Sequence, residues 1–397
     1  MQLTLKRPLS SNAKLNFASF YFLVFFGFGA LFPLLSVYLN DSIGLSGTQI
    51  GIIMSISPVV TILAQPLWGI TSDYTQKPKL VLMLTILCTA LIGIGFSFVS
   101  SYVWLIAMAA LLAVTQSAAV PISDSLALSY VQKTNGNYGS IRLWGALGFA
   151  VAVLVVGRLA ETFSLSVIFY VFALMLIVSS IFAWNLPGES NSLQVNIRSG
   201  ISRLIKMPRF LLFLVTTFLI FGPILANNFY FGIFIRDIGG TLTGVGLAFM
   251  LGAGSEAPFM KFAGNWIKKF GMLQILIFAG SVSGLRWLVY FFEPSLYLVF
   301  ATIIAQGFSV GLFIPAALQY VRDISPSSVR VTAVSLYSAV GNGLGSWFST
   351  FVGGMILDAY DINHVYLFYS LLTFSGLLLL IVIMLIDRKK RFNVVIN

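Results

Sequence analysis

Long apolar runs separated by short polar connections follow one another along the whole chain. A helix that crosses the hydrocarbon of a bilayer needs about 20 apolar residues. Backbone groups in hydrocarbon must find partners inside a helix or a closed barrel, and runs of this length favour helices. The sequence therefore predicts an all-α membrane protein with twelve transmembrane helices. We assign these helices to residues 17–39, 48–71, 80–99, 102–129, 138–157, 164–184, 210–235, 240–266, 272–292, 295–321, 330–357 and 365–386.

The longest polar connection, residues 185–207, divides the predicted helices into two sets of six. We expect an N-terminal six-helix half at residues 1–190, a cytoplasmic linker at 191–207 and a C-terminal six-helix half at 208–397. Two halves around a binding site near the bilayer midplane are typical of secondary transporters.

The composition excludes a soluble protein, because only 9% of the residues are charged and 58% are hydrophobic, whereas soluble domains carry about 25% charged residues. In a soluble protein the net charge of +11 would suggest nucleic-acid binding. Here it follows from membrane topology, and we expect no nucleic-acid partner. One cysteine and one histidine cannot form a Cys/His metal cluster, so we expect neither a metal nor a cofactor. The expected partners are the lipid bilayer, a small-molecule substrate and protons.

Basic residues outside the predicted helices lie mostly on one side of the membrane. The loops of the opposite side hold only Arg158 and Arg236. Cytoplasmic loops are enriched in Lys and Arg, so we expect a multi-pass protein of the cell membrane with both termini in the cytoplasm. The basic residues of the expected cytoplasmic side are Lys6, Arg7, Lys14, Lys77, Lys79, Lys133, Arg198, Arg203, Lys206, Arg209, Lys268, Lys269, Arg322, Arg330, Arg388, Lys389, Lys390 and Arg391.

Five ionisable residues remain inside the predicted helices: Asp124, Arg142, Glu256, Lys261 and Arg286. A charge at the bilayer centre costs about 3 kcal/mol or more, so such residues usually have partners or face a wet cavity. Asp124 and Arg142 are 18 residues apart and Glu256 and Arg286 are 30 apart, each pair with a turn midway. Each acid therefore lies at the depth of its base in an antiparallel helix pair. Lys261 lies nearer the cytoplasmic end, where its long side chain can reach the interface.

Two interpretations of these charges remain open. They are either structural ion pairs that fix helix packing, or groups that bind substrate and carry a coupling proton. A buried carboxylate can change its protonation state when its surroundings change, which a proton-coupled transporter requires.

The connection after the second predicted helix resembles a loop motif of the major facilitator superfamily. The segment Gln65-Pro-Leu-Trp-Gly69-Ile-Thr-Ser-Asp73, followed by Lys77, is similar to the family pattern G-x-x-x-D-x-x-G-R-K, with Gln76 in place of the second glycine. The resemblance implies that Gly69, Asp73 and Lys77 form a loop that locks the two halves together in one conformation.

The fourth and fifth predicted helices resemble the branch of this superfamily that contains the 3-phenylpropionate permease. Residues 120–127 and 138–149 carry this likeness, together with Glu256, Gly284-Leu-Arg286-Trp287 and residues 337–340. It extends over nearly the whole chain. Lactose permease and the bacterial nucleoside–proton symporters resemble it more distantly. The resemblance implies the major facilitator fold.

The resemblance to lactose permease implies a role for several positions. Its sugar-binding acid and arginine correspond to Asp124 and Arg142, and its stacking tryptophan to Phe149. An Asp–Lys pair of lactose permease corresponds to Asn228 and Asn342. We expect Asp124, Arg142, Phe149 and Asn228 to bind substrate.

The proton relay of lactose permease is not reproduced, since its coupling His and Glu correspond to Gln306 and Ser309. Asp124 and Glu256 are then the remaining buried carboxylates. We expect Glu256 to carry the proton with Arg286 beside it, and Asp124 is the alternative carrier.

These observations predict a secondary active transporter that works as a monomer and imports a small organic solute by proton symport with alternating access. Sugar, nucleoside and aromatic acid all remain open as substrates. The alternative is a proton-coupled exporter of drugs or metabolites, although the G-P-x-x-G-G run common in exporters does not occur in residues 146–157. Neither a catalytic cluster nor a nucleotide-binding loop indicates an enzyme.

Overall fold

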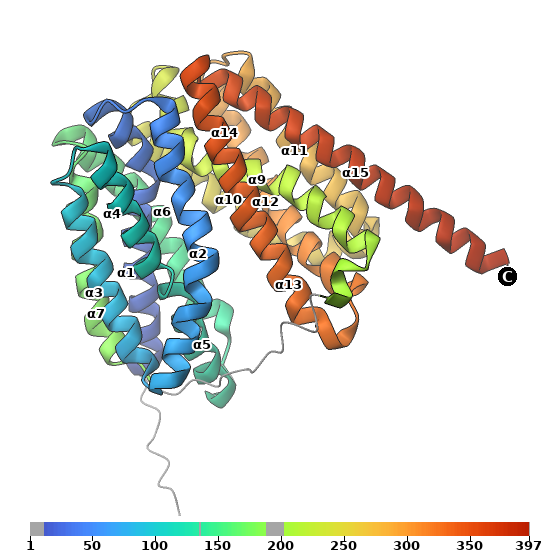
Figure 1. Cartoon of the computed structure of the whole chain (residues 1–397), viewed down its shortest axis with the longest axis horizontal. Helices are drawn as coiled ribbons and strands as arrows, with labels where there is room; N and C mark the ends of the chain where they lie inside the picture. Colours follow the sequence, from blue (N-terminus) through green and yellow to red (C-terminus); the bar gives the residue numbers. More distant parts are fainter. Residues whose placement is uncertain (1–11, 135, 188–201, 397) are drawn as a thin grey trace, which may run out of the picture.

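The computed structural model describes residues 12–134, 136–187 and 202–396, and the elements found there are helices. Figure 1 shows the first helices gathered on one side of the molecule and the later ones on the other. The N-terminal side consists of α1 (Asn12–Val37, extended by a π-helical turn at Tyr38–Ser42), α2 (Gly47–Thr75), α3 (Pro78–Phe96), α4 (Tyr102–Gln116), α5 (Ala119–Thr134), α6 (Tyr138–Thr162) and α7 (Val167–Trp184). The C-terminal side consists of α9 (Pro208–Asp237), α10 (Leu242–Phe270), α11 (Met272–Phe291), α12 (Leu296–Ile324), a 3-10 turn (Ser327–Val329), α13 (Arg330–Ser338), a π-helical segment (Ala339–Gly345), α14 (Ser346–Ala359) and α15 (Ile362–Ile396).

Ten membrane-crossing segments in the described ranges are long and apolar enough to be recognised by length and composition alone. The other two crossings are α10, which carries Glu256, and the broken helix α13–α14. The predicted fold with twelve spans is confirmed. The expected boundary at residue 190 falls within residues 188–201, which lie outside the described ranges, and the expected linker at 191–207 lies mostly within them. The domain boundaries therefore stay predictions.

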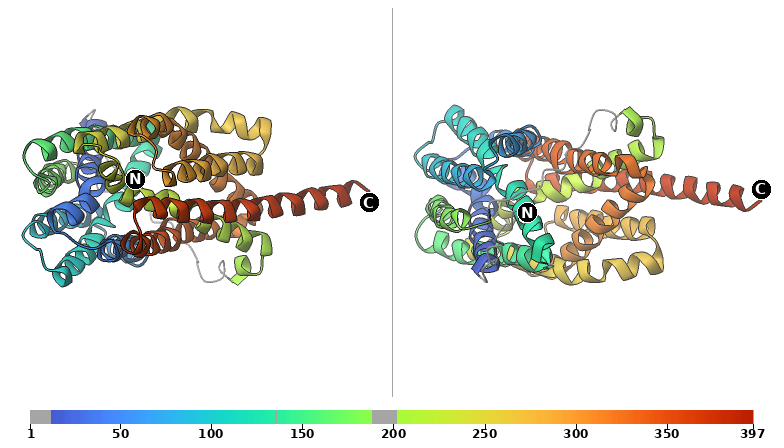
Figure 2. Two further views of the ribbon diagram at one scale, coloured as in Figure 1. Left: turned by 90° about the horizontal axis from the view of Figure 1, so that it is seen from above. Right: turned by 90° about the horizontal axis from the view of Figure 1, so that it is seen from below.

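The last helix, α15, is the longest of the C-terminal half. In both orientations of Figure 2 it extends well beyond the other helices.

Two of the predicted spans are interrupted. The span at 102–129 consists of α4 and α5, which are separated at Ser117 and Ala118. Pro121 explains the break, because proline has no N–H and clashes with the carbonyl four residues earlier, here that of Ser117. The span at 330–357 contains the π-helical segment Ala339–Gly345, whose three glycines weaken a regular α-helix.

The two halves touch closely at one end of the bundle, where α2 packs on α14 and α6 packs on α10. Glycine permits both contacts. A Cβ atom built on Gly47 would lie 2.9 Å from the Gly354 carbonyl oxygen, and one built on Gly246 would overlap the Val153 carbonyl oxygen. Two polar contacts join the halves at the same end: the Thr48 hydroxyl donates to Asp358 (2.9 Å), and Thr243 donates to Glu161. This end of the bundle is closed.

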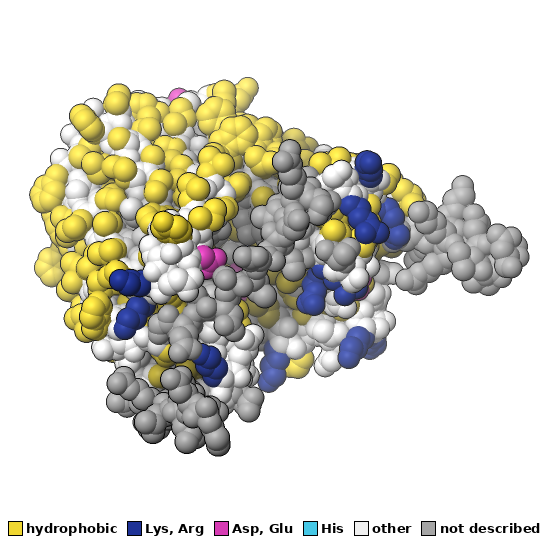
Figure 3. Space-filling model, turned by 60° about the horizontal axis from the view of Figure 1, so that its bottom comes forward, with side chains coloured by type: hydrophobic (Ala, Val, Ile, Leu, Met, Phe, Trp, Pro, Cys, Tyr) yellow, Lys and Arg dark blue, Asp and Glu magenta, His cyan; other side chains and the backbone are white. Residues whose placement is uncertain are grey.

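The other end of the bundle, which we call the basic face, is open. In Figure 1 the two halves diverge toward α5 and α13, and Figure 3 shows Lys and Arg side chains gathered on this side. We call the closed end the opposite face. Basic residues of the basic face include Lys77, Lys79, Lys133, Lys268, Lys269, Arg322 and Arg330.

Candidate functional site

A cavity of about 1170 Å³ lies between the two halves. Gln65 and Pro66 of α2 and Thr332 and Ser335 of α13 line its part near the basic face. Four of the residues expected to bind substrate or carry a proton lie in its wall. They are Arg142, Phe149, Asn228 and Glu256.

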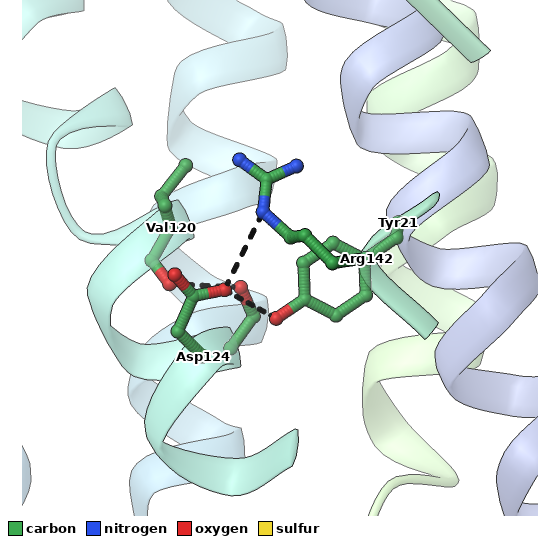
Figure 4. A network of polar contacts seen from close by, with 5 residues as sticks. Tyr21, Val120, Asp124 and Arg142 are labelled. Carbon is green, nitrogen blue, oxygen red and sulfur yellow. Dashed lines mark hydrogen bonds and ion pairs between the residues drawn. The ribbon is translucent and has the colours of Figure 1, made fainter. Parts of the chain in front are cut away.

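Figure 4 shows an ion pair between Arg142 and Asp124, and Arg142 also lines the cavity. The Arg142 Nε atom lies 4.0 Å from Asp124 Oδ1, and both side chains keep about a third of their surface exposed. The Tyr21 hydroxyl donates to the same carboxylate oxygen over 2.5 Å. Asp124 lies behind Arg142, outside the cavity wall. The pair therefore presents a guanidinium to the cavity and holds its counter-charge behind it.

Aromatic rings of α1 hold the Arg142 guanidinium in place. Its Cζ atom lies 4.2 Å from the centre of the Phe25 ring and 5.6 Å from that of Tyr21. Such cation–π contacts contribute about 0.5–2 kcal/mol each. They leave the planar N–H groups of the guanidinium available for bidentate bonds to a ligand. Phe149 follows Arg142 by seven residues, about two helical turns, and so reaches the same cavity.

In the C-terminal half, Glu256 of α10 lies in the cavity wall and Arg286 of α11 lies behind it. Arg286 is buried, with 4% of its surface exposed. Its Nη2 atom donates to Gln306 Oε1 over 2.7 Å, and its Cζ lies 4.4 Å from the centre of the Trp287 ring. Among the described side chains, Glu256 and Arg286 do not approach within the 4.0 Å of an ion pair. The positive charge of Arg286 thus acts on Glu256 electrostatically without direct contact. Gln306 lies between Arg286 and the cavity.

The cavity also contains uncharged polar residues that the sequence analysis did not assign. Ser57, Thr61 and Gln65 of α2 line it, and Gln116 of α4 donates to the Ser57 hydroxyl over 3.1 Å. Ser57, Thr61 and Gln65 recur every four residues within an apolar helix, and this spacing could have revealed them. The π-helical segment contributes Asn342, and α9 contributes Asn228.

The expected loop motif lies at the basic face. Gly69, Asp73 and Lys77 are exposed, and a Cβ atom on Gly69 would meet no neighbour within 4 Å. None of the contacts found between described residues joins Asp73 or Lys77 to the C-terminal half. This agrees with an open basic face, in which a lock between the halves would be released. Lys261 is exposed on α10.

Two helical halves around a polar cavity that is closed at one end and open at the other define a membrane transporter. A sequence profile of the MFS_1 like family matches residues 14–368. The chain belongs to this family, and the expected resemblance to the major facilitator superfamily is confirmed.

Several known proteins are similar to this chain over nearly its whole length. Maltose permease of Geobacillus stearothermophilus is 52% identical over 374 residues, which cover 93% of this chain and 94% of the relative. The uncharacterized transporter YwbF of Bacillus subtilis (strain 168) is 45% identical over 372 residues, 94% of this chain and 93% of the relative. The crystal structure of the nucleoside transporter NupG superposes with a TM-score of 0.85 at 17% identity, covering 94% of this chain and 98% of that one. This structural likeness shows the fold alone.

Proposed function

We propose that the protein imports maltose or a closely related oligosaccharide by proton symport with alternating access. The observation that carries the proposal is the cavity between the halves, with the Asp124–Arg142 pair at its N-terminal wall and Glu256 at its C-terminal wall. The identity of 52% to a maltose permease supports the choice of substrate.

The lining of the cavity fits a sugar better than an aromatic acid or a nucleoside. A sugar needs many hydrogen-bond donors and acceptors, and Arg142, Gln65, Gln116, Asn228 and Asn342 supply amide and guanidinium groups on both sides. The Phe149 ring offers an apolar surface against which the CH face of a sugar ring can lie. Asp124 keeps the arginine paired, so no anionic ligand is needed to balance its charge.

Glu256 is proposed to carry the coupling proton. Among the described residues that line the cavity, Glu256 is the acidic one. Asp124 is already engaged, because it pairs with Arg142 and accepts a hydrogen bond from Tyr21. Glu256 forms no direct ion pair with any described residue, so proton uptake there breaks no ion pair within this part of the chain. In this structure Arg286 is buried and donates to Gln306, so its positive charge lies close to the cavity without contacting Glu256 directly.

The remaining assignments follow from the same geometry. We propose that the basic face is cytoplasmic, since Lys and Arg gather there, so that the structure corresponds to an inward-open state. A single chain is proposed to be the working unit, because its cavity is formed entirely within one chain.

Counterflow in proteoliposomes tests the choice of substrate. Vesicles loaded with unlabelled maltose should accumulate labelled maltose transiently, and external maltose should compete. A nucleoside and 3-phenylpropionate serve as competitors of the other two classes. Competition by either of these, together with failure of maltose, would disprove the sugar assignment. Energised cells that extrude preloaded maltose would instead indicate the export alternative.

A further inference from the structure

A second hollow, of about 570 Å³, lies on the outer surface of the N-terminal half between α2 and α3. It lies beside the end of α4 at Gln116, where Thr115 lines it, and none of its lining residues belongs to α5. We call it the α2–α3 groove. Its lining consists of Trp68, Thr71, Thr75, Lys77, Leu80, Val81, Leu84, Thr85, Cys88 and Thr115.

The wall of the groove offers few free hydrogen-bonding groups, although it contains several hydroxyl groups. Thr71, Thr75 and Thr85 donate to carbonyl oxygens of their own helices over 2.8–2.9 Å. The Trp68 Nε1 atom donates to the Val114 carbonyl oxygen at the end of α4 over 2.7 Å. These donors are therefore satisfied within the protein. The groove can accept a hydrocarbon chain without leaving polar groups unpaired.

The groove lies among side chains that face the lipid. Leu63, Leu67 and Ile70 of α2 and Leu84 of α3 each expose half or more of their surface. Both helices are membrane spans by length and composition. The medium around the groove is thus hydrocarbon, which makes an acyl chain its natural occupant.

Lys77 places one positive charge at the end of the groove. It precedes α3 at the basic face and is exposed, and none of the contacts between described residues occupies its ammonium group. Its neighbour Lys79 is engaged elsewhere, since its Nζ atom donates to the Trp184 carbonyl oxygen over 3.1 Å and lies 5.2 Å from the centre of that ring. Lys77 is therefore the cation available to a ligand in the groove.

We propose that the α2–α3 groove binds one anionic phospholipid, with an acyl chain between α2 and α3 and the phosphate at Lys77. An apolar slot that ends in a single cation at the level of the lipid head groups matches such a lipid at both ends. The thiol of Cys88, the only cysteine of the chain, lines the slot and lies beneath the acyl chain.

Native mass spectrometry of the purified protein with added phosphatidylglycerol or phosphatidylcholine tests this site. The wild type should hold one phosphatidylglycerol more tightly than phosphatidylcholine. A basic residue near an anionic lipid contributes about 1 kcal/mol, so Lys77→Gln should weaken phosphatidylglycerol binding about fivefold. Lys269→Gln, which removes another exposed charge of the basic face, is the matched control and should change nothing.

Cys88 provides a second readout that does not depend on counting lipids. Its alkylation by a maleimide should be slower in wild type with phosphatidylglycerol than with phosphatidylcholine, and Lys77→Gln should remove the difference. Equal affinity for the two lipids, or equal losses in Lys77→Gln and Lys269→Gln, would overturn the proposal. Displacement of phosphatidylglycerol by inorganic phosphate alone would reduce the site to an anion site without an acyl chain, which also contradicts it.

Discussion

Glu161, near the end of α6, accepts two hydrogen bonds from Thr243, in the first turn of α10. The Thr243 backbone N–H donates over 2.9 Å and its hydroxyl over 2.5 Å, so the carboxylate of one half caps a helix of the other. Asp358, near the end of α14, accepts from Thr48 in the first turn of α2 in the related manner. Negative charge is favourable at a helix N-terminus. The two contacts are pseudo-symmetric latches that hold the opposite face closed.

Breaking both latches should favour opening of the opposite face. We expect the double variant Glu161→Gln, Asp358→Asn to populate longer distances between spin labels at Phe163 and Tyr360, two exposed positions on either side of this closure. Cys88→Ser supplies the background for labelling. Asp361→Asn is the control, because the partner of Asp361 is His364, three residues away in the same half. An unchanged distance distribution in the double variant would mean that glycine packing alone closes this face.

Because α6 and α10 approach closely at Gly246, a larger side chain at this position should impair transport strongly. A side chain there would meet the Val153 carbonyl oxygen, and backbone cannot move aside as a flexible side chain can. Gly246→Val should therefore prevent closure of the opposite face and abolish transport while the protein still inserts. Gly254→Val on the same helix is the matched control, since a Cβ atom at Gly254 meets nothing within 4 Å. Equal maltose transport by the two variants would contradict the packing argument.

Arg142→Lys should weaken substrate binding strongly without preventing insertion. Lysine keeps the charge next to Asp124 but loses the planar fork. Hydrogen bonds to charged groups contribute about 1.5–3 kcal/mol, so we expect maltose affinity to fall about tenfold to a hundredfold. Isothermal titration of the purified variant measures this, with Arg158→Lys at an exposed position as the control. Wild-type affinity in Arg142→Lys would remove Arg142 from the binding site.

Hydropathy and resemblance together predicted the class and the twelve spans, because these depend on local composition and spacing. The same reasoning could not show that Arg286 bonds to Gln306 rather than to Glu256, since that depends on the rotation of α11 against α12. It missed Gln116, whose position in the cavity depends on the break before Pro121. The contacts of Glu161 and Asp358 were also missed, because each joins residues that are far apart in the sequence.

The resemblance also shaped the choice of functional residues. Asp124 and Arg142 could be chosen from spacing alone, since an acid and a base at equal depth predict a pair, and the structure places them 4.0 Å apart. Asn228 carries no charge and could be chosen only through the likeness to lactose permease. The structure places its side chain in the cavity wall, and its role in binding stays a prediction.

Proton coupling through Glu256 is the central claim, and one comparison tests it most directly. Proteoliposomes with an imposed proton gradient, acidic outside, are supplied with labelled maltose, and accumulation is compared with exchange at equal pH. Wild type and Glu293→Gln, a matched change at an exposed position, should accumulate maltose above the external concentration. Glu256→Gln should exchange maltose at a rate near that of wild type and reach only equal concentrations on both sides. Accumulation by Glu256→Gln to the wild-type level would contradict the account and move the proton to Asp124 or the coupling to another ion.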